Sequence, residues 1–282
     1  MTLPSGNNKP ARRKIWKSPA IHHRMVLYQQ LLEDLNMKKM TILAMLAACL
    51  LSSHAFSRSF TVGVQDTDYR PIFRGDQPQY SGYARELLDT FAAKHGYTFS
   101  YRPFPSVNLY QEFVVNKSLD FKFPDNPNWS QDIKKGVNIV YSKGILVVTQ
   151  GLMVSPENKG KGVENINKMV TLRGFTPFPF MERIKSKKID VMEVNYTGAA
   201  INIVASGRVD GAYMGVMAAN YVMSETLNKK GLLVYDDTLP HANADFSLSS
   251  IAHPEVIQQF NEFLVKEKDA LTKLKAKYKI VE

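Results

Sequence analysis

The chain has 282 residues, with 36 Lys and Arg against 26 Asp and Glu, a formal net charge of +10. Eight of the basic and two of the acidic residues lie in positions 1–57, which leaves 28 basic and 24 acidic residues, a net charge of +4, in positions 58–282. A nucleic-acid-binding protein needs a basic stripe in its folded part, and the lysine groups at 134–135, 185–188 and 273–279 are short and dispersed, as expected for solvated helix faces, so we exclude that class.

A secretory signal is indicated at positions 37–57. A basic pair precedes an apolar run, and Ser53-His54-Ala55 suits cleavage between small residues. The apolar run is too short to span a bilayer as a stable helix. We therefore expect export to the periplasm. Residues 1–36 are expected to be a non-native or disordered extension, with translation starting at Met37.

The single cysteine, Cys49, offers an alternative to ordinary cleavage. Leu46-Ala47-Ala48-Cys49 resembles a bacterial lipobox, which would allow a lipid to be attached at Cys49. Two further leucines continue the apolar run beyond this residue, and a conventional cleavage site follows them, so we favour cleavage without lipidation. The mature protein would then contain no cysteine and no disulfide.

The folded part is predicted to begin with a strand, a loop, a helix and a second strand. Residues 60–64 are β-branched and aromatic, and Pro71 requires this strand to end before it, because proline cannot donate to a sheet. The next loop leads into a helix over 82–96, whose apolar residues recur at helical spacing and whose last residue, Gly96, suits a helix end. Residues 97–101 alternate as a strand.

Helices and strands continue to alternate along the chain, which is typical of mostly parallel α/β sheets. The long strand over 145–154 and the segment 236–243 are expected to carry the chain from one lobe to a second lobe and back. The other strands are predicted over 119–123, 137–141, 168–172, 189–194, 212–214, 232–235 and 246–251, and the helices over 106–116, 177–188 with Thr176 as its N-cap, 198–206, 216–228 and two segments after Pro254.

The opening elements and Gly207-Arg208-Val209-Asp210-Gly211-Ala212 resemble the family 3 bacterial extracellular solute-binding proteins, the periplasmic binding proteins of polar amino acid ABC transporters. The resemblance covers residues 59–282 and is carried by the order of elements. It implies the type II periplasmic-binding-protein fold, with two α/β lobes joined by a two-segment hinge. We expect lobe 1 to comprise residues 58–149 and 241–282, and lobe 2 residues 150–240.

Polar, aromatic and cationic residues follow three of the predicted strands. Ligands of open α/β sheets bind outside the carboxyl ends of the strands, so these residues are candidates for a ligand site. Aromatic and amide groups would line a pocket wall, and an arginine fork can hold two oxygens of a carboxylate. Each residue also has an ordinary role as a turn former, a helix cap or a surface charge. The candidates are Tyr69, Arg70, Asp125, Asn126, Trp129, Arg173 and Thr176.

The sequence departs from the family at two positions that bind amino acids. The family's ligand-carboxylate arginine is absent from the region 129–135, and Gly215 stands where the family has an aspartate for the ligand's amino group. A buried charge without a partner is costly, so a cleft that lacks both groups disfavours a zwitterion unless others substitute. The identity of the ligand therefore stays open.

The resemblance implies an exported solute-binding protein that captures a small polar or anionic organic solute between two lobes and delivers it to the membrane permease of an ABC transporter. We expect a monomer with no cofactor and no metal. The alternatives are a periplasmic enzyme on the same fold, such as a dehydratase, and a sensory module that presents its ligand to a receptor. The sequence has no metal-binding His/Cys spacing, phosphate loop or nucleophile elbow, so we expect no catalytic residue.

Overall fold

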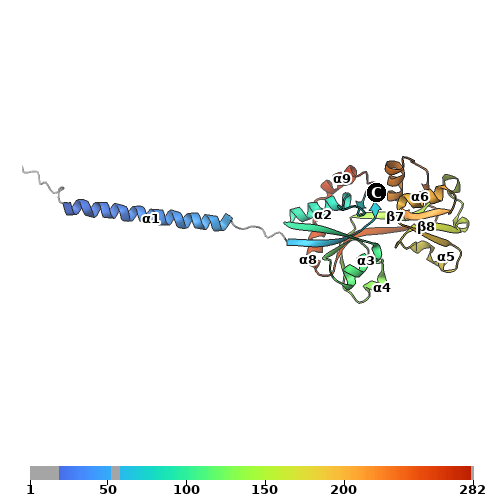
Figure 1. Ribbon diagram of the computed structural model, residues 1–282, viewed down its shortest axis with the longest axis horizontal. Helices are drawn as coiled ribbons and strands as arrows, with labels where there is room; N and C mark the ends of the chain where they lie inside the picture. The colour runs from blue at the N-terminus through green and yellow to red at the C-terminus, as the bar shows by residue number, and fades with distance from the viewer. Residues whose placement is uncertain (1–18, 52–57, 281–282) are drawn as a thin grey trace, which may run out of the picture. The chain divides into compact units, whose positions relative to one another are not determined.

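The computed structural model describes residues 19–51 and 58–280. The chain divides into two compact units, residues 1–56 and 57–282, and each is described by itself. The described part of the first unit is helix α1, Pro19–Leu51 (Figure 1). Proline suits the first turn of a helix, and the sequence from 20 to 51 has no glycine or further proline that would end it.

Residues 19–36 lie within this helix, and the expected nature of the extension stays a prediction. Residues 1–18, the predicted cleavage site at 53–55 and the side chain of Cys49 lie outside what the structure describes. Within the described ranges, no helix combines the length and the apolar character needed to cross a bilayer.

The second unit is built on a mixed sheet. Its ten strands within residues 58–280 are β1 Arg58–Gln65, β4 Tyr97–Phe104, β5 Phe121–Asp125, β6 Val140–Tyr141, β7 Leu146–Val154, β8 Lys168–Leu172, β9 Asp190–Val194, β10 Gly211–Gly215, β11 Val234–Tyr235 and β12 Ala242–Ser250. The order along the sheet is β4-β1-β5-β12-β7-β10-β8-β9, with β6 beside β12 and β11 beside β7. The strands β4, β1 and β5 are parallel, and so are β10, β8 and β9.

Two antiparallel strands join these parallel groups. Residues 146–150 of β7 pair with residues 242–246 of β12. Beyond this pairing β12 continues along β5, while β7 continues along β10, so each strand passes from one group to the other. The predicted strand over 145–154 is confirmed as β7. The strand predicted over 246–251 begins earlier, at Ala242, because β7 supplies a pairing partner for residues 242–246.

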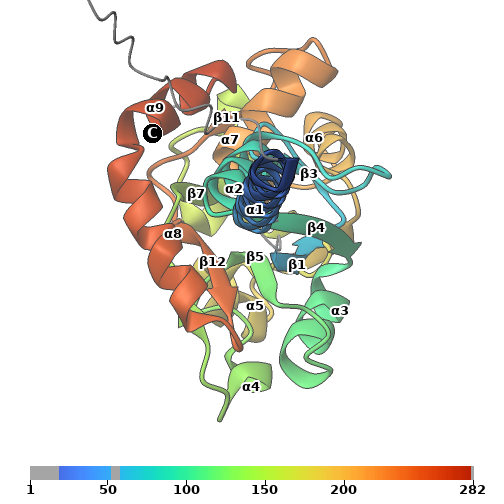
Figure 2. The same ribbon diagram turned by 90° about the vertical axis from the view of Figure 1, so that its left-hand side faces the viewer.

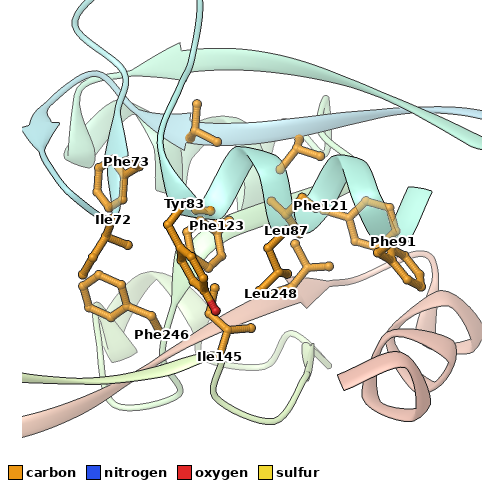
Figure 3. Close-up of a cluster of buried hydrophobic side chains, with 14 of the residues drawn as sticks. Ile72, Phe73, Tyr83, Leu87, Phe91, Phe121, Phe123, Ile145, Phe246 and Leu248 are labelled. Carbon is orange, nitrogen blue, oxygen red and sulfur yellow. The ribbon is translucent and has the colours of Figure 1, made fainter. Parts of the chain in front are cut away.

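The core of the β4-β1-β5 lobe is rich in phenylalanine. Helix α2, Tyr83–Lys94, directs Leu87 and Phe91 toward the strands, where Phe121 and Phe123 lie (Figure 3). The ring of Phe91 also lies 5.0 Å from that of Phe260 on helix α8, Pro254–Lys266. Full burial of one such side chain contributes about 1.5–3 kcal/mol, so this cluster anchors α2 and α8 to the sheet.

Further helices complete this lobe. Helix α9, Lys268–Lys277, follows α8, and α3, Ser106–Tyr110, continues into the π-helical turn η1, Gln111–Val115. The short helix α4, Gln131–Lys134, lies near η1. Figure 2 shows α8 and α9 along one margin of the folded unit and α3 with α4 toward its lower end. The hairpin β2 Asp68–Tyr69 and β3 Phe73–Arg74 was predicted as a loop.

The other lobe has a small core on each face of β10. Ala212 and Met214 belong to one apolar cluster and Tyr213 to the other, as the alternation of a strand requires. Helix α6, Thr197–Ala205, α7, Val216–Tyr221, and the π-helical turn η5, Val222–Thr226, cover the first face. The 3-10 turns η2 Pro156–Asn158, η3 Val163–Asn165 and η4 Phe178–Phe180 and helix α5 Met181–Lys185 complete this lobe.

The helix predicted over 177–188 is shorter than expected. Pro177 occupies the N-cap position of η4, no side chain caps it, and the α-helical part starts only at Met181. Phe178 precedes Pro179, and the residue before a proline is disfavoured in the α conformation, so a regular α-helix begins only after Pro179. The predicted N-cap role of Thr176 is therefore wrong.

Candidate functional site

A cavity of about 70 Å³ lies between the two lobes, at the ends of β1, β5 and β8. About 10–15 Å³ of such space holds one water molecule, so the cavity suits a small guest. Its walls combine two amides and three aliphatic hydroxyls with five aromatic rings, and none of these groups is charged at neutral pH. The lining residues are Gln65, Ser106, Tyr110, Trp129, Ser130, Gln150, Gly174, Phe175, Thr176, Phe178 and Phe246.

The lobes touch each other around this cavity. A Cβ atom on Gly174, which follows β8, would lie 3.2 Å from the Cβ of Ser106 at the start of α3. The guanidinium carbon of Arg70 lies 5.3 Å from the ring centre of Tyr221 on α7. The rings of Tyr69 and Phe175 are 6.0 Å apart. Because each pair joins the two lobes, the lobes are in direct contact around the cavity.

A larger pocket of about 840 Å³ lies on the opposite face of the connecting strands. It is lined by Val147, Thr149 and Asn243, whereas the smaller cavity is lined by Gln150 and Phe246, and neighbouring strand residues point to opposite faces. None of the seven predicted site residues lines the larger pocket. We place the candidate site in the smaller cavity, because strand ends of both lobes meet there.

Trp129 and Thr176 are the two predicted site residues that line the cavity. They come from opposite lobes, in the loops after β5 and β8. The indole packs edge-on against Phe246, with 5.5 Å between ring centres. This contact holds the indole against the connecting strand β12.

The two predicted arginines do not line the cavity. Arg70 is held by Asp68 through a fork, with Nε to Oδ1 at 2.8 Å and Nη2 to Oδ2 at 2.6 Å. The side chain of Arg173 is 70% exposed, and its Nε lies 3.9 Å from a carboxylate oxygen of Glu193. Both guanidinium groups therefore face carboxylates of the protein itself.

Tyr69 is fully buried between the lobes and lies behind the cavity wall. Its ring stacks on Phe73 at 5.3 Å and contacts Phe246 at 5.8 Å. Its hydroxyl points at the end of β10, where a Cβ atom added to Gly215 would lie 1.8 Å from it. Within the described residues this hydroxyl has no hydrogen-bond partner, and burial raises the pKa of Tyr69 above its ordinary value.

We expect Tyr69→Phe to leave the free energy of unfolding unchanged or to raise it by about 1–2 kcal/mol, because a buried hydroxyl without a partner costs about 1–3 kcal/mol. The measurement is urea denaturation of the ligand-free protein. Tyr101→Phe is the matched control, since the hydroxyl of Tyr101 donates to Asp89 at 2.6 Å and its loss should lower stability by about 1 kcal/mol. A clear loss of stability in Tyr69→Phe would contradict the expectation.

Asp125 and Asn126 lie behind the cavity lining rather than in it. The Nδ2 of Asn126 donates to the carbonyl oxygen of Asp245 at 3.0 Å. Asp125 is fully buried, and its carboxylate accepts hydrogen bonds from the hydroxyls of Tyr110 at 3.2 Å and Ser249 at 2.7 Å. Of these partners Tyr110 lines the cavity, so Asp125 is one side chain away from it.

Two buried lysines surround Asp125, and we call the three residues the Lys122–Asp125–Lys134 cluster. The Nζ of Lys134 lies 2.8 Å and that of Lys122 lies 3.3 Å from Oδ1 of Asp125. Their second bonds go to the carbonyl oxygens of Asn126 and Pro124, each at 2.7 Å. Burial alone would raise the pKa of Asp125, but the two ammonium groups outweigh it and hold that pKa below its ordinary value.

The sequence reasoning missed this cluster. Lys134 was predicted on a solvated helix face, and that prediction is wrong, because the residue is only 8% exposed. Lys122 carried a usable signal, since it alternates with Phe121 and Phe123 in a strand and must therefore point to the other buried face of the sheet. Within residues 19–51 and 58–280, no three His, Cys, Asp or Glu side chains come together as a metal site.

Comparisons with known proteins agree on the fold. No family model and no curated protein matches the chain. An arginine 3rd transport system periplasmic binding protein from Legionella pneumophila is similar in structure at 13% identity and a TM-score of 0.62, over 79% of this chain and 100% of that one. A histidine kinase sensor domain with similarity to periplasmic binding proteins matches at 18% identity and 0.61, over 79% and 96%.

A third similar structure is an ancestral amino acid-binding protein that is a precursor of cyclohexadienyl dehydratase. It matches at 18% identity and a TM-score of 0.58, over 78% of this chain and 95% of that one. All three similarities span the folded unit and confirm the predicted arrangement of two α/β lobes.

Proposed function

From the type II periplasmic-binding-protein fold that the chain shares with these structures, we propose that the protein is an exported solute-binding protein. It holds a small polar or anionic organic solute between its lobes and delivers it to the permease of an ABC transporter. The observation that carries the proposal is the small, uncharged, polar and aromatic cavity whose lining comes from both lobes. We propose residues 58–149 with 241–282 as lobe 1, residues 150–240 as lobe 2, and a monomer in the periplasm.

A cavity shared between lobes supports a capture mechanism. A solute that contacts both lobes does so only in the closed form, so binding shifts the population toward closure. The paired strands β7 and β12 are the only two chain connections between the lobes in residues 58–280, and they are the proposed hinge. The closed form is then the state that docks on the permease.

The proposed contacts follow from the cavity lining. Trp129 would cover an apolar part of the solute, and Thr176 would donate to it from the opposite lobe. The amides of Gln65 and Gln150 and the hydroxyl of Ser106 supply further hydrogen bonds. The other sequence candidates act from outside the lining: Tyr69, Asp125 and Asn126 behind the walls, and Arg70 and Arg173 at the rim.

The test is a binding screen of the full chain against pooled polar metabolites, by native mass spectrometry and then calorimetry. We expect Trp129→Ala to bind the recovered solute at least about tenfold more weakly, because loss of the indole contact should remove more than about 1.4 kcal/mol of binding free energy. Tyr196→Ala is the matched control, since Tyr196 is 62% exposed and does not line the cavity. A folded sample that binds no member of the pool would overturn the proposal.

We propose binding without turnover. The lining residues include no carboxylate, histidine or amine that could act as a general acid or base at neutral pH. The similarity to a dehydratase precursor keeps the enzyme alternative testable, and recovery of the solute in chemically altered form would favour it. The similarity to a sensor domain supports the alternative of a sensory module that presents its ligand to a receptor. A permease gene next to the gene for this protein would argue against that alternative.

A further inference from the structure

We propose that the cavity takes a small carboxylate, and that an uncompensated positive charge buried behind Tyr110 selects it. The charge belongs to the Lys122–Asp125–Lys134 cluster. This inference rests on the proposed function and names the chemical class of its solute. It places the cation behind the cavity wall rather than in it.

The cluster holds two ammonium groups and one carboxylate. Lys122 and Asp125 are fully buried and Lys134 is 8% exposed, so water screens these charges little. Both ammonium groups share the same oxygen, Oδ1 of Asp125, while Oδ2 accepts from the neutral hydroxyl of Ser249. The two ammonium groups also contact backbone carbonyl oxygens and the rings of Tyr110 and Tyr141, none of which carries a formal charge. One positive charge is therefore left in excess.

The excess charge faces the cavity through a single aromatic ring. The Nζ of Lys122 lies 4.1 Å and that of Lys134 lies 5.1 Å from the ring centre of Tyr110, which lines the cavity. No acidic side chain is among the lining residues to offset it. The effective dielectric constant of a protein interior is lower than that of bulk water, so two charges interact more strongly there. The excess positive charge of the cluster therefore favours an anion in the cavity.

The protonation state of the cluster supports this charge count. Burial lowers the pKa of Lys122 to about 8, against the attraction of Asp125. The contacts of its Nζ with Oδ1 of Asp125 at 3.3 Å and with the carbonyl oxygen of Pro124 at 2.7 Å favour the ammonium form. The cavity walls suit the organic part of the same guest, because hydroxyls and amides can donate to carboxylate oxygens while five rings surround its carbon atoms.

The experiment compares acids with neutral amides of the same shape. Acetate, lactate and pyruvate are titrated calorimetrically into the full chain, at pH 7 and constant ionic strength in a buffer without carboxylate, beside acetamide, lactamide and pyruvamide. We expect at least one acid to bind about tenfold or more tightly than its amide. Lys134→Met should remove most of this acid-to-amide ratio and leave amide binding unchanged.

Controls separate charge from packing. Lys122→Met removes the same excess positive charge of the cluster and should reduce the acid-to-amide ratio as Lys134→Met does. It is the substitute variant if Lys134→Met does not fold. Lys143→Met removes an exposed lysine of the same lobe and should keep the ratio. Equal binding of acids and amides, an unchanged ratio in both cluster variants, or no binding of any acid would overturn the inference. The proposed function falls only if the metabolite pool also yields no ligand.

Discussion

Replacing Asp125 with alanine should lower the free energy of unfolding by about 3–5 kcal/mol, which is the expected cost of breaking a buried charge pair by removing one partner. The carboxylate is the counter-charge of two buried ammonium groups at 2.8 and 3.3 Å. In the variant, Lys122 and Lys134 would keep only carbonyl partners and would repel each other. Urea denaturation at pH 7, monitored by circular dichroism, measures the change.

Two comparisons make this expectation specific. Ser249→Ala removes one neutral hydrogen bond to the same carboxylate and should cost only about 1 kcal/mol. The pH dependence gives the second comparison, because the pKa of Asp125 is lower in the folded state than its ordinary value. Its contribution is present above the unfolded-state pKa, near 4, and is lost as the pH falls through the folded-state pKa. The variant and the parent protein should therefore converge in acid, and a pH-independent difference would contradict the account.

Gly215→Ala should disturb closure of the lobes, although it adds one methyl group. The added Cβ would lie 1.8 Å from the hydroxyl oxygen and 2.6 Å from Cζ of Tyr69. The ring of Tyr69 cannot move aside easily, since it is fully buried and stacked on Phe73. We expect about 1–3 kcal/mol of overpacking, which shifts the population toward open lobes. Open lobes would expose Trp129, so its fluorescence emission should move to longer wavelength.

The double variant isolates this contact. Tyr69→Ala combined with Gly215→Ala removes the clash, so the two changes together should cost less than the sum of the single changes. Gly198→Ala is the matched control: its Cβ would meet no atom nearer than 3.9 Å, and alanine within helix α6 should be neutral or slightly stabilising. If Gly215→Ala behaved like Gly198→Ala, the proposed close contact between the Tyr69 hydroxyl and Gly215 would be refuted.

The sequence was sufficient for many of the individual helices and strands, because hydrophobic periodicity is a local property, whereas the fold was implied by the resemblance of their order to a known family. The strand at 60–64 and the helix at 82–96 correspond to β1 and α2, and Gly96 takes the positive φ of +68° expected after a helix. The prediction that strand ends carry the site also led to Trp129 and Thr176, which line the cavity. The ligand contacts of these two residues stay a prediction.

The structural features that the sequence did not reveal depend on contacts between residues far apart in the chain. Tyr69 and Gly215 are far apart in the chain, and no local pattern indicates that a ring after β1 would end against β10. Lys134 is buried because its ammonium group contacts Asp125 and the ring of Tyr110. Both residues lie outside the segment 131–134, so the pattern of that segment could not reveal them. Gln65, Ser106 and Gln150 were missed in the same way, because polar residues at strand and helix ends have many ordinary roles.

The pairing of β7 with β12 has a consequence for how this architecture can change over evolutionary time. Gln150 and Ala242 face each other across neighbouring antiparallel strands, so the chain leaves the first lobe and re-enters it at almost the same point. Cα atoms paired in this way are about 4.5–5.5 Å apart, a gap that a short hairpin turn can close. The segment between them is thus an insertion with adjacent ends, and recombination could exchange it for another without cutting the first lobe's core.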